Sequence, residues 1–459
     1  MSDLLYSTKN IYETASPELI SLMSDYAEGY KAFLNTAKTE RESVEYAVGY
    51  AKARGFREYV TGEKVQPGDK IYFNNRGKAI YLAIIGSLSL REGCNVAAAH
   101  VDAPRLDLKS NPLYEDNEIA YLRTHYYGGV KKYQWHTIPL ELRGVIIRGD
   151  GEKVQVSIGS DPADPRFVIT DILPHLGEKQ SAKTVRDAFP GEDLKILFGT
   201  RPDCADDKEK NKVKYGIMKL LNEKYGVTEA DFLSAELEIV PAHEARDVGL
   251  DRSLVGGYGH DDRACGYAAL TAICNFEGTP ARTAVTMLVD KEEIGSEGTA
   301  GMQSRAFERF MGALSRSQGV SLDDCFAESF CVSNDVCNAF DPNFAEVSDK
   351  QNNALLNHGV SFMKYTGSRG KSGSNDANAE TVATLRRIFA ANEVAWQMGE
   401  LGKVDAGGGG TVALYMAKRN IETIDAGVPV LSMHSPWELI SKADLYMTYR
   451  SIAAVFKDR

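Results

Sequence analysis

The fold is decided by the stretch Thr283-Ala284-Val285-Thr286-Met287-Leu288-Val289, which runs directly into Asp290-Lys291-Glu292-Glu293-Ile294-Gly295-Ser296. Its first half is apolar or small, rich in β-branched residues and bounded by charge, which predicts a short buried strand. Ligands of open α/β sheets bind outside the carboxyl ends of the strands, so the acids after this strand mark a candidate site. Adjacent glutamates repel each other unless a cation or a proton lies between them. A solvated acidic turn is the alternative interpretation, and the rest of the chain has to decide between the two.

The size and composition of the chain are those of a globular protein. Its 459 residues are 43% hydrophobic and carry a formal charge of −11, which argues against nucleic acid or an anionic membrane as a partner. No apolar run is long enough to cross a bilayer, and Met1–Tyr6 does not resemble a signal peptide. The seven cysteines show no C-x-x-C spacing and are predicted to be buried thiols in a reducing compartment. We therefore expect a soluble cytoplasmic protein.

Helix and strand patterns alternate at both ends of the chain and change in the middle. Ser16 and Pro17 form a good N-cap and first turn, and the apolar residues behind them recur at helical spacing. From about residue 106 the pattern becomes β-rich, with a hairpin at 140–158 around a glycine-rich turn. This block ends near Pro241, so we predict an α/β protein with an inserted, β-rich second domain. Further helices are predicted at 40–53, 209–224, 298–317, from about 377, and at 412–418.

Five segments end in residues that can hold a metal ion. The small-residue strand 96–99 delivers His100 and Asp102 to one face, because side chains alternate along a strand, and Asp102 suits the orientation of a ligating histidine. Each segment alone has an ordinary explanation: acids at a helix start cap it, and a single histidine is more often a core residue. The five positions are His100, Asp261, Glu293, Asp335 and His434.

Taken together, these five residues predict a metal centre. Two histidines and three carboxylates without a cysteine suit zinc, cobalt or manganese. If one carboxylate bridges, two ions each receive one histidine, one terminal carboxylate and the shared ligand. Two ions roughly 3.5–4 Å apart can activate one water molecule and polarise the carbonyl that it attacks. Glu292 lies next to a ligand but is not needed as one, so it can take the proton from that water.

Five motifs contain the candidate residues, namely His100-Val101-Asp102-Ala103-Pro104, Asp261-Asp262-Arg263, the stretch 290–296, Asn334-Asp335 and Ser432-Met433-His434-Ser435. In these motifs the chain resembles the M18 metallopeptidases, the aspartyl aminopeptidase family. The likeness covers nearly the whole chain with order and spacing kept, and it is closest to the bacterial branch called aminopeptidase 1.

The resemblance implies a fold, an assembly and a metal content. The fold is a three-layer α/β/α metallopeptidase domain of residues 1–105 and 250–459, with a β-rich oligomerisation domain inserted at 106–249. The assembly is a homo-oligomer, namely a dodecamer built from dimers. Each subunit is expected to hold two divalent ions, zinc first and cobalt or manganese next.

The resemblance also implies a role for each site residue. One ion would be held by His100 and Asp335, and the other by Glu293 and His434. Asp261 would bridge the two ions. The remaining three roles are support of His100 by Asp102, general-base catalysis by Glu292, and contact of His175 with the active site of a neighbouring subunit.

Substrate binding is expected at a basic loop, residues 364–375, and at a glycine loop, residues 407–410. From these loops Lys364, Gly409 and Gly410 are the candidate residues. The cationic loop could pair with an acidic substrate side chain, and a solvated connector is the alternative. Two features depart from family members of established acidic specificity, which carry an Asn-Asp-Thr-Pro-Cys-Gly type segment where this chain has 404–411. The basic loop also lacks the aromatic residue expected before Ser374-Asn375.

Three functions compete at this point. The first is a two-metal aminopeptidase that acts on peptides with a free N-terminus and releases single residues, with Asp and Glu as the candidate preference. The second is another two-metal amide hydrolase, a deacylase or a dipeptidase, because related sites serve several hydrolyses. The third is a self-assembling scaffold without catalysis. The full ligand set and Glu292 favour the enzymes over the scaffold.

Overall fold

The structure is a computed structural model that describes residues 4–203 and 209–459. The chain divides into two compact units, which are described separately. No helix in the described ranges is long and apolar enough to cross a membrane. The first unit is Met1–Ala103, Ala245–Met433 and Trp437–Arg459, and the second unit is Pro104–Glu244 with His434–Pro436.

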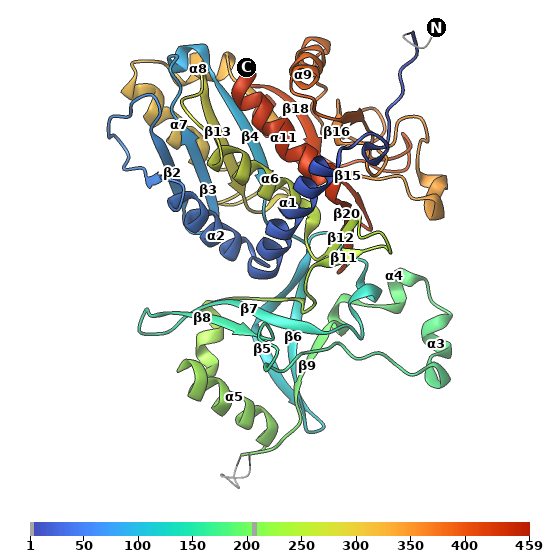
Figure 1. Ribbon diagram of the computed structural model, residues 1–459. Coiled ribbons are helices and arrows are strands. Elements are labelled where there is room, and N and C mark those ends of the chain that lie inside the picture. Colours follow the sequence, from blue (N-terminus) through green and yellow to red (C-terminus); the bar gives the residue numbers. More distant parts are fainter. Residues whose placement is uncertain (1–3, 204–208) are drawn as a thin grey trace. The chain divides into compact units, whose positions relative to one another are not determined.

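The first unit is built on a mixed sheet that contains the predicted strand 283–289 (Figure 1). This strand, β13, is buried along its whole length and pairs in parallel with β4 and antiparallel with β3. Its central position explains its largely apolar sequence, because neither face of a central strand meets water. In order across the sheet, the described strands are β1 (Arg57–Glu58), β2 (Lys70–Asn75), β3 (Ala79–Ile84), β13 (Thr283–Val289), β4 (Cys94–His100), β14 (Phe330–Ser333), β18 (Glu422–Gly427), β16 (Val360–Met363) and β17 (Trp396–Met398).

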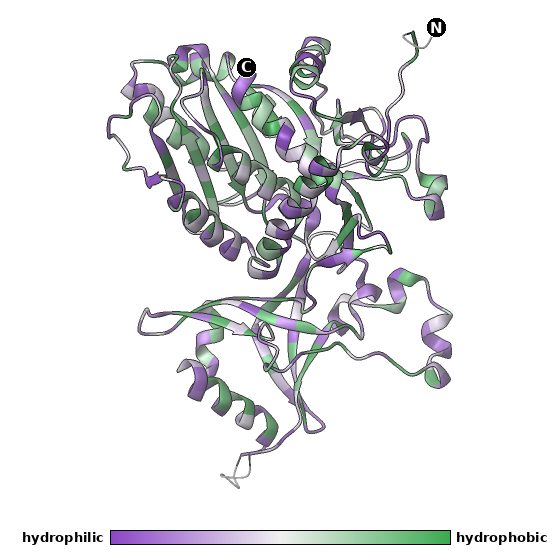
Figure 2. Ribbon diagram, viewed as in Figure 1, coloured by the Kyte–Doolittle hydropathy of each residue, from purple (hydrophilic) through white to green (hydrophobic). Residues whose placement is uncertain are grey.

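Helices cover both faces of this sheet. Leu288 packs into a core with residues of α1, α2, α6 and α11, whereas Met287 packs into a second core with residues of α7 and α8. The strands therefore form a largely hydrophobic middle layer (Figure 2), and the predicted α/β/α architecture is confirmed. The helices are α1 (Pro17–Thr36), α2 (Glu40–Lys52), α6 (His260–Cys274), α7 (Ala306–Ser317), α8 (Leu322–Ala327), α9 (Ala379–Ala391), α10 (Ala413–Ala417) and α11 (Lys442–Asp458).

Local sequence explains where several of these helices begin. The Ser16 side chain accepts a hydrogen bond from the Leu19 N–H at the start of α1, as predicted. The predicted helix at 298–317 is too long at its N-terminal end, because α7 begins only at Ala306. Ser296 and Gly298 have positive φ angles of 60° and 94°, which break a helical path.

A smaller sheet completes the first unit. It contains the strand after which His434 follows, β19. In order, its strands are β11 (Arg246–Val248), β12 (Leu254–Gly257), β20 (Glu438–Ser441), β19 (Pro429–Leu431) and β15 (Cys337–Asn338).

The second unit is β-rich. Its sheet is antiparallel throughout, and the predicted hairpin at 140–158 is its β7–β8 pair. Within the described residues it is accompanied by two short helices, α3 (Glu178–Ser181) and α4 (Val185–Ala188), and by the longer α5 (Lys212–Tyr225). In order, the strands are β8 (Lys153–Ile158), β7 (Leu140–Ile147), β10 (Ala235–Pro241), β5 (Arg105–Asp116), β6 (Ile119–Tyr127) and β9 (Lys195–Gly199).

Candidate metal centre

Three parallel strands of the large sheet bring the first candidate ligands together. The last residue of β4, His100, pairs with the last residue of β13, Val289, so both strands end at the same level. On the other side of β4, the Asn334 N–H after β14 donates to the carbonyl oxygen of Ala98 over 2.6 Å. Residues that follow these strands are therefore collected at one edge of the sheet, where α/β proteins bind their ligands.

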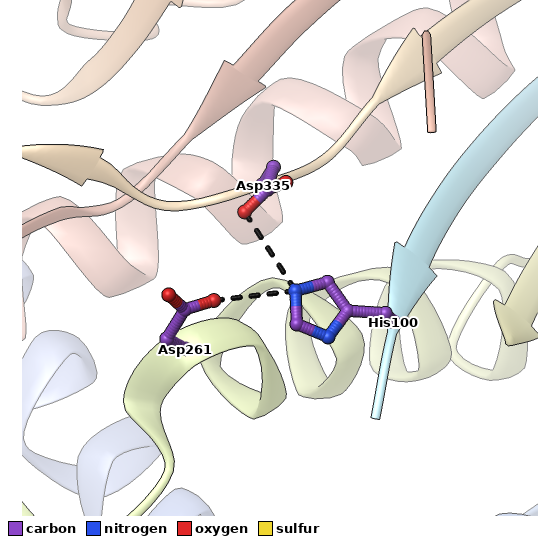
Figure 3. Close-up of side chains that lie close together, drawn as sticks. All are labelled: His100, Asp261 and Asp335. Atoms are coloured by element: carbon purple, nitrogen blue, oxygen red, sulfur yellow. Dashed lines mark ion pairs between the residues drawn. The ribbon is translucent and has the colours of Figure 1, made fainter. Parts of the chain in front are cut away.

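His100, Asp261 and Asp335 form a buried cluster at this edge (Figure 3). The His100 Nε2 lies 3.2 Å from the Asp261 Oδ1 and 3.9 Å from the Asp335 Oδ1. One potential ligand atom from each residue lies within 4.8 Å of the others. A third carboxylate oxygen, Oε2 of Glu292, lies 3.9 Å from the same imidazole nitrogen.

Asp102 ties this cluster to the acidic turn after β13. The Nδ1 of His100 lies 3.0 Å from the main-chain oxygen of Asp102 and 3.3 Å from its Oδ1. The two carboxylate oxygens of Asp102 accept the backbone N–H groups of Glu292 and Glu293, each over 3.2 Å. Asp102 therefore fixes both the imidazole and the turn, although the predictions assigned it only the first contact.

The pKa shifts indicate a shortage of positive charge. Burial lowers the pKa of His100, but hydrogen bonds to Asp102 and Asp261 outweigh burial and raise it well above its ordinary value. Burial raises the pKa of Asp335 well above its ordinary value, and nearby Asp262 raises it further. Both shifts favour the form with the additional proton. A bound cation supplies positive charge in the same place, so this donor set suits a divalent metal ion.

Glu292 and Glu293 lie in a sharp turn, Glu292–Ile294, and both are half-buried. The turn is flanked by Lys291 and Gly295, which have φ angles of 71° and 95°. Glycine is the residue that adopts such angles without strain. Asp290, the third acid of the stretch, is fully buried, and burial followed by the charges of Glu40 and Asp102 raises its pKa to about 7.

The two remaining candidate histidines group with the second unit. His434 follows β19 by three residues, has a φ angle of 64°, and places its Nδ1 2.9 Å from the carbonyl oxygen of Gly129. His175 is exposed in the short turn Pro174–Leu176.

The candidate substrate residues lie in two loops that contact each other. Lys364 directly follows β16 and is half-buried. The Gly409 N–H donates to the carbonyl oxygen of Thr366 over 3.0 Å, and Gly410 lies against Gly373. Lys371 of the basic loop is engaged already: its Nζ lies 2.9 Å from the Asp376 carboxylate and 3.9 Å from the centre of the Tyr365 ring.

Sequence reasoning missed one further group near the cluster. Glu438 of β20 is buried, and its Oε2 accepts the backbone N–H of Asp261 over 3.2 Å. The two residues are 177 positions apart, and no local sequence pattern marks Glu438 as a partner.

Comparisons with known proteins show which family the chain resembles over nearly its whole length. The family model described as "Aminopeptidase I zinc metalloprotease (M18)" matches residues 33–456. A "Probable M18 family aminopeptidase 1" of Clostridium acetobutylicum is 48% identical over 461 residues, 99% of each chain. Two solved structures cover 99% of this chain and 100% of their own: the M18 aminopeptidase of Thermotoga maritima, at 40% identity and a TM-score of 0.94, and aminopeptidase I of Clostridium acetobutylicum, at 44% and 0.93.

Proposed function

Because the chain belongs to the M18 family of zinc metalloaminopeptidases, we propose that it releases single amino acids from peptides with a free N-terminus by a two-metal mechanism. The observation that carries the proposal is the buried His100–Asp261–Asp335 cluster, whose imidazole also lies 3.9 Å from Glu292. A histidine and a carboxylate at the ends of parallel strands, with a second carboxylate from the start of α6, match the nitrogen and oxygen ligands that zinc prefers.

The ligand sets we propose are His100 and Asp335 for one ion, Glu293 and His434 for the other, and Asp261 for both. The short connection between β19 and His434 supports the choice of His434 as a ligand. Its three-residue distance from β19 limits its reach to roughly 11 Å from the end of that strand, which belongs to the first unit. When bound, two divalent ions would lower the pKa of an attacking water and polarise the scissile carbonyl.

Glu292 is the proposed general base. A carboxylate can take the proton of the attacking water only if its own position is fixed. Here the backbone N–H of Glu292 is held by Asp102, and its side chain is half-buried beside the imidazole of His100. After attack on the carbonyl, the same carboxyl group can return the proton to the departing amine.

His175 is the proposed partner of the developing oxyanion in a neighbouring subunit. It lies in an exposed segment with three large apolar side chains, Ile172, Leu173 and Leu176, which are 46%, 50% and 67% exposed. Such a segment suits burial against another chain. A hydrogen bond from His175 would then stabilise negative charge on the substrate oxygen. This role agrees with the dodecamer that the family resemblance implies.

The proposal includes a preference for N-terminal Asp or Glu, which requires a cation to pair with the carboxylate of the substrate side chain. Lys371 is paired with Asp376, so Lys364 is the better cation for a substrate carboxylate. Release rates from a panel of aminoacyl anilides test whether acidic residues are preferred. Faster release of neutral or basic residues would remove the acidic preference and leave the aminopeptidase activity standing.

Glu292→Gln tests the mechanism. The variant should keep its metal ions, because Glu292 is not a proposed ligand, and its turnover should fall by roughly 10²–10⁴. Release of free amino acids is measured on matched peptides with open and acetylated N-termini, together with metal content. The exposed Glu297→Gln, in the same acidic segment, is the matched control. Nearly normal turnover by Glu292→Gln with its metals bound would exclude the general-base role, and equal cleavage of blocked peptides would favour a deacylase.

A further inference from the structure

Asp425 is a fully buried carboxylate in β18 that the proposed function leaves without a role. It pairs in register with Ser333 of β14, two residues before the proposed ligand Asp335. Its Oδ1 accepts the hydroxyl of Thr411 over 2.6 Å. Burial raises its pKa to about 6, while the hydroxyls of Thr411 and Ser333 lower it. Burial of a carboxylate costs folding free energy unless the group is hydrogen-bonded, so the hydrogen bond to Thr411 indicates what Asp425 does.

Thr411 connects Asp425 with the glycine loop by a hydrogen bond. It is 9% exposed and directly follows the glycine loop 407–410. Its Oγ1 also accepts the N–H of Ala413 over 3.3 Å, at the start of α10. One hydroxyl therefore joins the buried strand, the glycine loop and the first turn of a helix.

The glycine loop is packed against the basic loop at Gly408, where there is no room for a side chain. A Cβ atom on Gly408 would lie 2.6 Å from the N atom of Ser368 and 2.7 Å from the carbonyl carbon of Gly367. The neighbouring Gly409 donates to Thr366. The glycine loop is therefore held against the basic loop at Gly408 and Gly409, and the hydrogen bond of Thr411 to Asp425 fixes the residue that follows the loop.

The middle of α10 contacts the turn of the proposed general base. The hydroxyl of Tyr415 donates to the carbonyl oxygen of Gly295 over 3.2 Å, directly after the turn Glu292–Ile294. The Gln303 Nε2 donates to the same oxygen over 2.9 Å. The segment 411–415 thus connects Asp425 with the turn that carries Glu292.

We propose that Asp425 is a positioning residue, which fixes the glycine loop for substrate binding through the hydroxyl of Thr411. This inference rests on the proposed function and on the expectation that Gly409 and Gly410 bind the substrate. It assigns no contact with substrate to Asp425 itself. Loss of the hydrogen bond should therefore weaken substrate binding more than the chemical step.

Thr411→Val removes the hydroxyl at nearly constant volume. We expect its KM for an aminoacyl anilide to rise about tenfold, the size of one lost hydrogen bond to a charged group, with kcat reduced less than about threefold. Thr411→Ser restores the hydroxyl and should return KM to within about twofold. Asp425→Asn keeps an accepting oxygen and should also stay near the wild type, whereas Asp425→Ala should behave like Thr411→Val. The matched control is Thr423→Val, since Thr423 is a buried threonine of the same strand whose hydroxyl donates to the Ile421 carbonyl.

The coupling of the two residues completes the test. If they act as one unit, the double variant Thr411→Val/Asp425→Ala should be no worse than either single variant. An unchanged KM in Thr411→Val, or a fall in kcat alone, would overturn the inference while the wild type still shows the proposed activity. A wild type that releases no amino acid from open peptides would instead refute the proposed function.

Discussion

Gly427→Ala should displace a proposed metal ligand without touching the ligand side chain. Gly427 is the last residue of β18, and a Cβ atom there would lie 1.8 Å from the carbonyl oxygen of Asp335 and 3.0 Å from the Sγ of Cys265. Ordinary carbon–oxygen contacts need more than about 3.3 Å, so β18 and the segment that carries Asp335 would have to separate by roughly 1.5 Å. Metal–ligand distances tolerate only about 0.2 Å. We therefore expect loss of the ion assigned to His100 and Asp335.

The same change should also weaken the fold. Overpacking of this kind costs about 1–3 kcal/mol of unfolding free energy. Metal content by mass spectrometry and the unfolding transition by calorimetry measure the two effects on one sample. Gly49→Ala is the matched control, because Gly49 lies in α2 with nothing within 4 Å of its added Cβ, and it should stabilise the protein by about 0.5–1 kcal/mol. A Gly427→Ala protein with two tightly bound ions and normal turnover would refute the reasoning.

Two further predictions concern assembly and pH. Mixed oligomers of His175→Ala and Glu292→Gln subunits should recover part of the activity that either variant lacks, because the first retains Glu292 and the second retains His175. Mixed oligomers that stay inactive would place His175 outside the neighbouring active site. Asp247→Asn should lower the unfolding free energy at pH 7 by about 3 kcal/mol, because Asp247 lies 2.7 Å from the Lys31 Nζ and 2.9 Å from the Lys442 Nζ. Burial raises the pKa of Asp247, but these two lysines hold it well below its ordinary value. Its contribution is therefore complete above pH about 4 and is lost as the pH falls further. Urea unfolding should show the difference between wild type and variant shrinking in acid, and a constant difference would contradict the assignment.

Sequence patterns were sufficient for the main framework. The apolar run 283–289 identified a central strand, and Ser16-Pro17 identified the start of α1, because both signals are local. Residues at strand ends, such as His100 and Asp335, could be grouped because parallel strands end at one edge of a sheet.

Contacts between distant residues could not be predicted in the same way. The carboxylate of Asp102 holds the backbone of Glu292 and Glu293, about 190 positions further along the chain. Glu438 reaches the backbone of Asp261 across a similar distance. Such contacts depend on how strands are ordered in the sheet, which the pattern of a single strand does not encode. The start of α7 was misplaced for a different reason, since left-handed residues at 296 and 298 replaced the expected first turns.

The central claim is a two-ion centre in which Asp261 is shared. Anomalous diffraction from crystals loaded with zinc tests it most directly. The account predicts two zinc peaks per chain, roughly 3.5–4 Å apart, with the Asp261 carboxylate between them. His100 and Asp335 should coordinate one peak, and Glu293 and His434 the other. A single peak, or two peaks with Asp261 bound to only one of them, would contradict the account.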